Sequence, residues 1–363
     1  MKTLLSLLAL SLSLFANTTT TCKKCHPTIV SEFNTSVHKH STLEADKVHK
    51  AVWDKHPLKK KNKYACAKCH APNNASSAHE GITCITCHRI KEIEEHPKSN
   101  TNIYEKKEKT FYSAQAGRED EKVTYKKVST WWGDTHTVGS AYHDIDYTNK
   151  IFYSGEVCMG CHSHKQNANK LDVCITENEG VSTDKDNCIT CHMPKVKGTA
   201  TTIRISQKHA FHGFAGVVTK PKMLKKYVIL ILNKKDKGFE VVVENKAPHK
   251  LLTHPLRVVQ LRTTLLRDTK QIQLPTYTFQ RVIGTDNKPS MPWLATEVVK
   301  DTMIKANEKR VLSFKENLQS GDKVEVELGF YRVNPKAIKG LGLQEDKELQ
   351  KFTILKTLYF EVK

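Results

Sequence analysis

The stretches Cys158-Met-Gly-Cys-His162 and Cys188-Ile-Thr-Cys-His192 decide the fold that this chain is expected to adopt. Each places two thiols three positions apart and a histidine directly after the second thiol. Two thiols at this spacing can bond covalently to the two vinyl groups of one haem, and the adjoining histidine then faces the iron as its proximal ligand. The other units of this kind in the 363 residues are Cys22-Lys-Lys-Cys-His26, Cys66-Ala-Lys-Cys-His70 and Cys84-Ile-Thr-Cys-His88.

Five such units predict five covalently bound haem c groups, each with its iron. A zinc site would use four converging ligands and gives no reason for a histidine after every second cysteine. A thioredoxin-like motif would occur once, and disulfides would not impose one spacing five times. The predicted attachment residues are Cys22, Cys25, Cys66, Cys69, Cys84, Cys87, Cys158, Cys161, Cys188 and Cys191, and the predicted proximal ligands are His26, His70, His88, His162 and His192.

The second axial ligand of each iron decides what the haem can do. An iron held by two histidines is closed to substrates and transfers electrons, whereas an iron with an open position can bind and transform a small ligand. Thirteen of the eighteen histidines lie outside the motifs, so the supply of second ligands is ample. The candidates are His38, His96, His143, His209, His249 and His254, with His212 beside His209, and with His79, His136 and His164 as reserves.

The composition divides the chain into three segments. Residues 1–16 join a lysine to a short apolar run and predict a signal peptide for export to a bacterial periplasm. Residues 17–220 hold every cysteine and form the predicted pentahaem cytochrome c domain, which should be helical and rich in loops, with little or no sheet. Residues 221–363 contain alternating β-branched and aromatic runs between turn signals, so we expect a C-terminal β-sandwich of about seven strands. The predicted class is therefore α+β and multidomain.

The charge of the chain bears on its partners. The formal net charge is +20, and residues 220–363 alone hold 28 Lys and Arg against 16 Asp and Glu. Such a charge favours an acidic redox partner or an anionic membrane surface. Haem propionates would offset part of it in the motif region. Export and the five motifs argue against nucleic acid.

Several stretches resemble a known family. The run from Cys158 to Asn167, the segment Cys188-Ile-Thr-Cys-His-Met-Pro194 and the segment His209-Ala-Phe-His-Gly-Phe214 are similar to multihaem c-type cytochromes related to the tetrahaem electron carrier of ammonia oxidation and to hydroxylamine oxidoreductase. The resemblance implies redox transfer. Pentahaem nitrite reductases of this group hold their active-site haem by a motif that ends in lysine, and this chain has no such motif.

These observations predict a periplasmic pentahaem c-type cytochrome that transfers electrons between periplasmic or membrane-bound redox proteins. The alternative is an oxidoreductase that acts on a small nitrogen or sulfur compound at one five-coordinate haem, with Trp131, His136 and His143 as a possible distal pocket. No catalytic residue is assigned. The eleventh cysteine, Cys174, is expected to be a small buried side chain.

Overall fold

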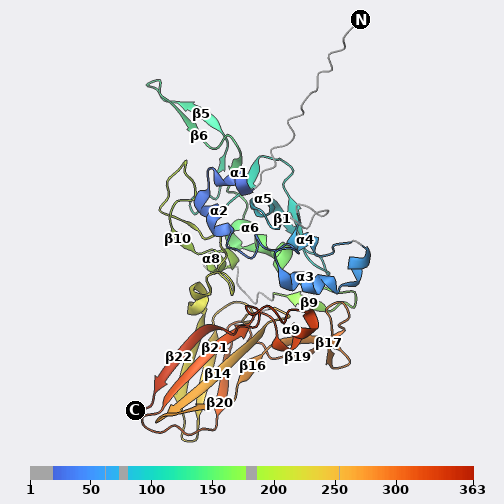
Figure 1. Ribbon diagram of the computed structural model, residues 1–363. Helices are drawn as coiled ribbons and strands as arrows, with labels where there is room; N and C mark the ends of the chain where they lie inside the picture. The colour runs from blue at the N-terminus through green and yellow to red at the C-terminus, as the bar shows by residue number, and fades with distance from the viewer. Residues whose placement is uncertain (1–18, 62, 73–80, 177–185, 253) are drawn as a thin grey trace.

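The structure is a computed structural model, and it describes residues 19–61, 63–72, 81–176, 186–252 and 254–363. The predicted signal peptide and His79 lie outside these residues. The described chain mixes helix and strand, as the sequence predicts. Figure 1 shows short helices and small sheets at one end of the molecule and long strands at the other. No helix in the described part of the chain is long and apolar enough to cross a bilayer.

The motif region is built from short helices. Each cysteine-histidine motif lies on or directly beside one of them, because the three-residue spacing of its cysteines brings both thiols to one side of a helical turn. The helices are α1 (Thr19–Lys23), α2 (Pro27–Phe33), α3 (Lys47–Asp54), η1 (Pro57–Lys61), α4 (Ala67–His70), α5 (Cys84–His88), α6 (Ile151–Ser154), η2 (Glu156–Cys158), α7 (Met159–His162) and α8 (Cys188–His192).

Small sheets connect these helices, so the expectation of little or no sheet in the motif region was wrong. The sheets are two- and three-stranded, and their strands are two to five residues long. The four two-stranded sheets form where a connection folds back as a hairpin, whereas the three-stranded sheet includes one parallel pair. The strands are β1 (Ile90–Glu94), β2 (Thr101–Tyr104), β3 (Thr110–Tyr112), β4 (Lys122–Val123), β5 (Lys126–Ser129), β6 (Thr135–Val138), β7 (Asp144–Asp146), β8 (His164–Gln166), β9 (Asp172–Ile175), β10 (Lys195–Lys197) and β11 (Lys208–Ala210).

The C-terminal region begins with η3 (Pro221–Tyr227) and contains the long strands. One sheet has the order β15-β14-β21-β22, with β16 also paired to β14, and a second has the order β12-β13-β20. A small third sheet, β18-β17-β19, lies toward the motif region (Figure 1). The elements are β12 (Val228–Lys234), β13 (Phe239–Asn245), β14 (Val258–Arg267), β15 (Lys270–Gln273), β16 (Tyr277–Phe279), β17 (Arg281–Thr285), β18 (Lys288–Pro289), β19 (Glu297–Asp301), β20 (Lys309–Phe314), β21 (Lys323–Tyr331), α9 (Pro335–Leu341) and β22 (Thr353–Glu361).

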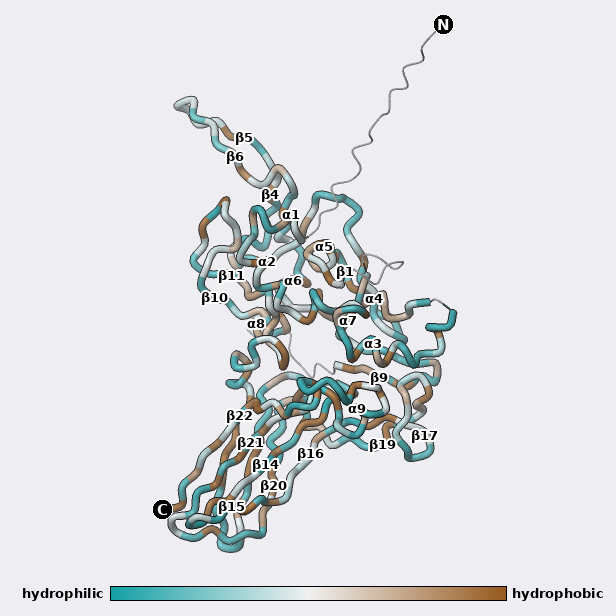
Figure 2. Tube along the Cα trace, viewed as in Figure 1, coloured by the Kyte–Doolittle hydropathy of each residue, from teal (hydrophilic) through white to brown (hydrophobic). Residues whose placement is uncertain are grey.

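One apolar core joins the two larger sheets. Val241 and Val243 of the three-stranded sheet belong to the same buried cluster as Leu261, Val326 and Leu328 of the other sheet. Alternate residues of each strand point into this core, and Figure 2 shows brown and teal positions alternating along these strands. The two sheets therefore enclose a core made entirely of side chains.

Contacts between the two regions fix their arrangement. Helix α9 buries Ile338 and Leu341 in a cluster that also contacts Val48 and Val52 of α3. On another side, the Arg281 guanidinium donates to the carbonyl oxygen of Asp172 at 2.7 Å. The C-terminal sheets thus contact the motif region through both apolar packing and polar contacts.

Candidate haem centres

Hydrogen bonds at the N-termini of α5 and α8 shape two of the motifs. The side chain of Thr83 accepts from the amide of Thr86, and the side chain of Asn187 accepts from the amides of Ile189 and Thr190. In each helix the threonine hydroxyl accepts in return from the amide of the capping residue. This reciprocal pattern fixes the first turn, which carries both cysteines and the histidine.

Every motif histidine lies opposite a second histidine from a distant part of the chain. In three pairs the rings are stacked with their centres 6.2 Å apart and with interplanar angles of 18–28°. In a fourth pair the centres are 5.8 Å apart and the rings are nearly perpendicular, at 78°. The stacked pairs are His26 with His143, His88 with His212 and His192 with His249, and the perpendicular pair is His38 with His162.

These separations fit one iron between the two rings. Metal–imidazole bonds are about 2 Å long and the bonding nitrogen lies about 1 Å from the ring centre, so two axial imidazoles place their centres about 6 Å apart. A direct stack of two rings would bring their centres much closer together. The four pairs therefore have the spacing of six-coordinate haem iron, in both the parallel and the perpendicular ring orientation.

The outer ring nitrogens support the same interpretation. Metal-bound histidines usually donate their other N–H to a carbonyl or carboxylate, which fixes the ring and leaves Nε2 to the metal. In seven of the paired histidines the Nδ1 atom lies 2.6–3.4 Å from a backbone carbonyl oxygen, and Nε2 is left for a metal. The contacts join His26 to Ala200, His70 to Ser41, His88 to Tyr112, His143 to Asp144, His192 to Ala215, His212 to Ala210 and His249 to Lys250.

Burial favours the neutral, metal-binding form of six of the paired histidines. It lowers the pKa of His38 and of His212 to about 3 and that of His70 to about 4. Burial also lowers the pKa of His88, His162 and His249. A neutral imidazole has a free lone pair, so the rings are ready to bind iron at neutral pH.

The pair at the second motif differs from the other four. The ring centres of His49 and His70 are 3.9 Å apart, at an interplanar angle of 60°. This distance is too short for an iron between the rings. The Nε2 atom of His49 also lies 3.4 Å from the Tyr64 hydroxyl. At the second centre, therefore, none of the histidines that the structure describes lies at the distance from His70 that a second axial ligand of the same iron would need.

Four of the predicted second ligands lie opposite motif histidines. They are His38, His143, His212 and His249. The sequence reasoning missed His49. A signal was present, because Asp46 caps α3 and the helix places His49 on the same face as Val52 and Trp53.

Three other candidates, His209, His96 and His254, are not paired with a motif histidine ring in the described part of the chain. Both ring nitrogens of His209 are engaged, Nδ1 with the Gly198 carbonyl and Nε2 with the Glu32 carboxylate at 2.9 Å each. His96 is exposed, and its Nδ1 accepts from the amide of Lys98. In His254, Nδ1 accepts from the amide of Leu256 at 3.2 Å, and among the described residues its ring is not paired with a motif histidine.

The reserve ligands His136 and His164 do not lie opposite a motif histidine, and Cys174 is not buried as predicted. His136 lies on the exposed hairpin strand β6, and Nε2 of His164 contacts the carbonyl oxygens of His96 and Pro97. The side chain of Cys174, on β9, is exposed instead of buried. Trp131 is 94% exposed, so it does not line a distal pocket with His143.

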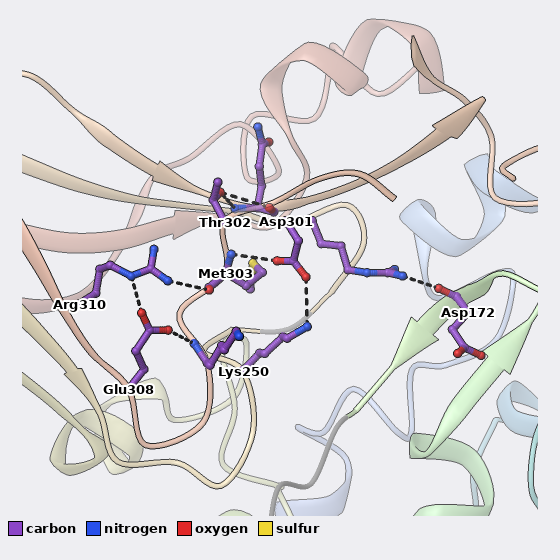
Figure 3. A network of polar contacts seen from close by, with 10 residues as sticks. Asp172, Lys250, Asp301, Thr302, Met303, Glu308 and Arg310 are labelled. Atoms are coloured by element: carbon purple, nitrogen blue, oxygen red, sulfur yellow. Dashed lines mark hydrogen bonds and ion pairs between the residues drawn. The ribbon is translucent and has the colours of Figure 1, made fainter. Parts of the chain in front are cut away.

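The C-terminal sheets supply one histidine to these pairs. The amide group of Asn245, at the end of β13, donates to the carbonyls of His249 and Lys305 at 2.9 and 2.8 Å. Figure 3 shows Asp301 accepting from the Lys250 ammonium at 3.1 Å and from the amide of Met303 at 3.0 Å. This network holds the loop that places the ring of His249 opposite that of His192.

Thiols of different motifs contact one another. Cys22 of the first motif hydrogen-bonds Cys84 of the third, and this bond lowers the pKa of Cys22 to about 7. Cys69 of the second motif has the same relation to Cys161 of the fourth. The fourth and fifth motifs meet through Cys158 and Cys188. These contacts join the first attachment site to the third, and the second and fifth attachment sites to the fourth.

A comparison with solved structures found a similar protein. The chain superimposes on the penta-heme cytochrome c552 from Thermochromatium tepidum with a TM-score of 0.73 and 21% sequence identity, over 95% of this chain and 98% of that chain. The two chains share a fold. No family model and no curated protein matches this sequence.

Buried cationic groups also fit a haem. Arg257 donates to the carbonyl of Leu252 at 3.2 Å, and burial, with the nearby charge of Arg332, lowers the pKa of its guanidinium to about 10. The same Arg257 charge contributes to the low pKa of His254, which lies near His70. A buried guanidinium is stabilised by a carboxylate, and haem propionates are carboxylates. A haem bound at the second motif would offer such a carboxylate to Arg257.

Proposed function

We propose that this protein is a pentahaem c-type cytochrome that transfers electrons along a connected chain of haems. The observation that carries the proposal is the spacing of the histidine rings, whose centres lie 6.2 Å apart in three pairs and 5.8 Å apart in a fourth. Thiols of different motifs also interact, at Cys22 with Cys84, Cys69 with Cys161 and Cys158 with Cys188. Each thiol bonds to the edge of its porphyrin. Contacting thiols therefore bring porphyrin edges together, which is the arrangement that electron transfer needs.

The contacts define a path. The first haem adjoins the third, and the second and fifth both adjoin the fourth. Cys87 of the third motif is close enough to Cys158 and Cys161 of the fourth to interact with them electrostatically. Electrons can thus pass from the first haem through the third and fourth to the fifth, with the second haem as a branch at the fourth.

The proposed axial ligands follow from the pairs. The irons of the first, third, fourth and fifth haems would be held by His26 and His143, His88 and His212, His162 and His38, and His192 and His249. Two imidazoles close an iron to substrates and give a low reduction potential. Four of the five haems are thereby suited to transfer and not to catalysis.

The proposal includes location and partners. The sequence of residues 1–16 and the motifs support an exported, periplasmic protein, since haem attachment of this kind takes place outside the cytoplasmic membrane. The partners would be periplasmic or membrane-bound redox proteins. The basic C-terminal region favours acidic ones. A relation to hydroxylamine oxidoreductase rests on the resemblance of the motif segments alone.

Reductive titration of the haem-loaded protein tests the transfer function. We expect each chain to take up five electrons and to release all five to a soluble high-potential acceptor in a single fast phase. Uptake of fewer than five electrons, or a haem that stays reduced while the others are reoxidised, would contradict the connected path.

A second function is favoured by the second centre alone. Because His49 and His70 are too close for an iron between them, the second haem can have an open position for a small nitrogen or sulfur compound. Electron paramagnetic resonance of the oxidised protein would then show one high-spin haem whose signal shifts with nitrite, hydroxylamine or a sulfur oxyanion. Five low-spin haems whose signals do not change with any of the three compounds would exclude this function. They would also show that His49 and His70 move apart to bind the iron between them.

A further inference from the structure

Exposed apolar side chains gather at the end of the molecule that carries the first motif. The most exposed large apolar side chains among the described residues are Trp131 (94%), Ile205 (89%), Trp132 (87%), Tyr359 (75%), Tyr142 (73%) and Ile203 (67%). All but Tyr359 lie in or beside two projecting segments. We name these segments the tryptophan hairpin, residues 126–138, and the isoleucine loop, residues 198–207.

The tryptophan hairpin is a well-formed projection. Strands β5 and β6 pair in register, from Lys126 with Val138 to Ser129 with Thr135. Thr130 closes the tip, because its amide donates to the Asp134 carbonyl at 2.7 Å and its hydroxyl accepts from the Asp134 amide at 3.1 Å. Figure 1 shows the hairpin standing away from the body of the molecule. Its two adjacent tryptophans are thus displayed at the tip of a defined turn.

The isoleucine loop is also held in shape. The hydroxyl of Thr199 donates to the carbonyls of Thr201 and Arg204 and accepts from the amide of Ser206 at 3.1 Å. These bonds tie the two sides of the loop together below its tip. The side chains of Ile203 and Ile205 remain in solvent, on either side of Arg204 in the sequence.

Both segments are attached to the first centre. His143 follows the tryptophan hairpin by five residues and stacks opposite His26. In the isoleucine loop, Ala200 accepts from Nδ1 of His26, and the amide of Thr202 donates to the carbonyl of Cys25 at 2.9 Å. The apolar tips therefore extend from the surroundings of one haem.

The two segments carry a positive charge. The hairpin contains Lys126 and Lys127 against one acid, Asp134, and the loop contains Arg204 between Lys197 and Lys208 at the ends of its flanking strands. Tryptophan prefers the boundary between lipid headgroups and acyl chains, and clustered Lys and Arg are attracted to anionic headgroups. Exposed apolar tips with cations in the same segments are the combination found in proteins that lie on membranes.

We propose that the tryptophan hairpin and the isoleucine loop dock this protein on an anionic phospholipid bilayer, with the first centre toward the membrane. The shape favours a bilayer over a protein partner. A stable protein interface uses about 800 Å² of contiguous, complementary surface on each side, whereas these are two narrow projections whose tip side chains contact almost nothing. Narrow tips can enter a fluid interface without a matching pocket.

One consequence rests on the proposed electron-transfer function. Docking in this orientation places the first haem, between His26 and His143, nearest the membrane. Electrons from a membrane-bound donor would enter there and leave from the second or fifth haem at the far side. The docking itself does not depend on electron transfer.

Vesicle sedimentation of the haem-loaded protein tests the docking without an electron-transfer readout. We expect binding to phosphatidylcholine vesicles that contain phosphatidylglycerol, little binding to phosphatidylcholine alone, and weaker binding at high salt. The double variant W131S/W132S should bind more than about tenfold more weakly, because even partial burial of a large aromatic side chain is worth about that factor. I203S/I205S should also weaken binding. The control Y359S, on β22, should leave binding unchanged.

Haem content and the visible spectrum of each variant show that it is folded. Three results would overturn the proposal. The first is a wild-type protein that does not sediment with anionic vesicles at low salt. The second is binding that W131S/W132S and Y359S change to the same extent. The third is vesicle binding that W131S/W132S leaves intact while the variant reacts more slowly with a soluble acidic redox protein, which would assign the tips to a protein partner.

Discussion

The motif region and the C-terminal region bury apolar side chains to very different extents. Among the described residues, thirteen buried apolar side chains lie between positions 19 and 220, against twenty-nine between 221 and 363. The buried members of the large cluster all come from the C-terminal region, such as Leu261, Phe239 and Val326. No buried apolar cluster in the described chain is formed by the motif region on its own.

The difference shows two ways to stabilise a fold. The C-terminal sheets gain their stability from side chains that leave water, at about 25 cal/mol for each Å² buried. The motif region has short helices, short strands and long connections, and its cysteines and histidines converge where a core would be. In our account five porphyrins supply the apolar surface of that core. The motif region should therefore depend on haem, and the C-terminal region should not.

Removal of one haem attachment site should have the largest effect. In the variant C188A/C191A the fifth haem cannot be attached, and we expect the motif region to lose protection from proteolysis while the C-terminal sheets keep theirs. Mass spectrometry of the haem-loaded chain and limited digestion measure the two effects. The control C174A changes an exposed thiol and should keep all five haems. A variant that loses one haem but keeps its motif region protected would contradict the porphyrin core.

A substitution in the C-terminal core should act in the opposite way. Leu261 on β14 is fully buried, so L261A should lower the free energy of unfolding of the sheets by about 2–5 kcal/mol. The control L266A, on the same strand, changes a side chain that is 40% exposed and should cost much less. Urea unfolding followed by circular dichroism measures both, and the haem spectrum should change little. Equal destabilisation by the two variants would argue against the core described here.

The histidine that crosses between the regions should have an intermediate effect. H249A removes the sixth ligand of the fifth haem, and we expect about one of the five haems to change from low spin to high spin. H254A should leave the spin states unchanged, because Nδ1 of His254 accepts from the amide of Leu256 and its ring is not paired with a motif histidine in the part of the chain that the structure describes. Electron paramagnetic resonance distinguishes the two variants. A new high-spin signal in H254A, with none in H249A, would show that His254 is an iron ligand and that His249 is not.

A smaller effect is expected at Glu32, which links α2 to the third centre. Its carboxylate accepts from Nε2 of His209 and from the backbone amide of His212 at 2.9 Å each. E32A leaves both donors without this acceptor and should destabilise the motif region by about 1–3 kcal/mol, with a shift in the signal of the third low-spin haem. E32Q keeps one acceptor oxygen and should lie between E32A and the wild type. An unchanged haem signal in E32A would show that Glu32 does not fix the position of His212.

The sequence predicted some features of this molecule and not others, for physical reasons. The five motifs are local, so their spacing alone predicts the attachment cysteines and the proximal histidines. Strand alternation is also local, and it predicted the long strands that β12, β14 and β21 show. The histidine pairs are not local. His192 meets His249 through a loop fixed by Asn245 and Asp301, and nothing in the spacing of the chain specifies that contact.

The errors have similar causes. His209 was chosen because it follows the fifth motif, but Glu32, which is 177 positions away in the sequence, binds it. His49 was overlooked because it precedes its motif on a helix that also packs against α9. The small sheets of the motif region have strands too short to show an alternating pattern. Each of these features depends on contacts between segments that are far apart in the chain.

Hydrogen exchange of the haem-free chain tests the central claim most directly. The protein can be produced without residues 1–16, in a cytoplasm where haem is not attached, and followed segment by segment by mass spectrometry. We predict slow exchange in the strands from β12 to β22 and fast exchange throughout residues 19–220, with slow exchange in both regions of the haem-loaded protein. Equal protection of the two regions without haem would contradict the claim that porphyrins form the core of the motif region.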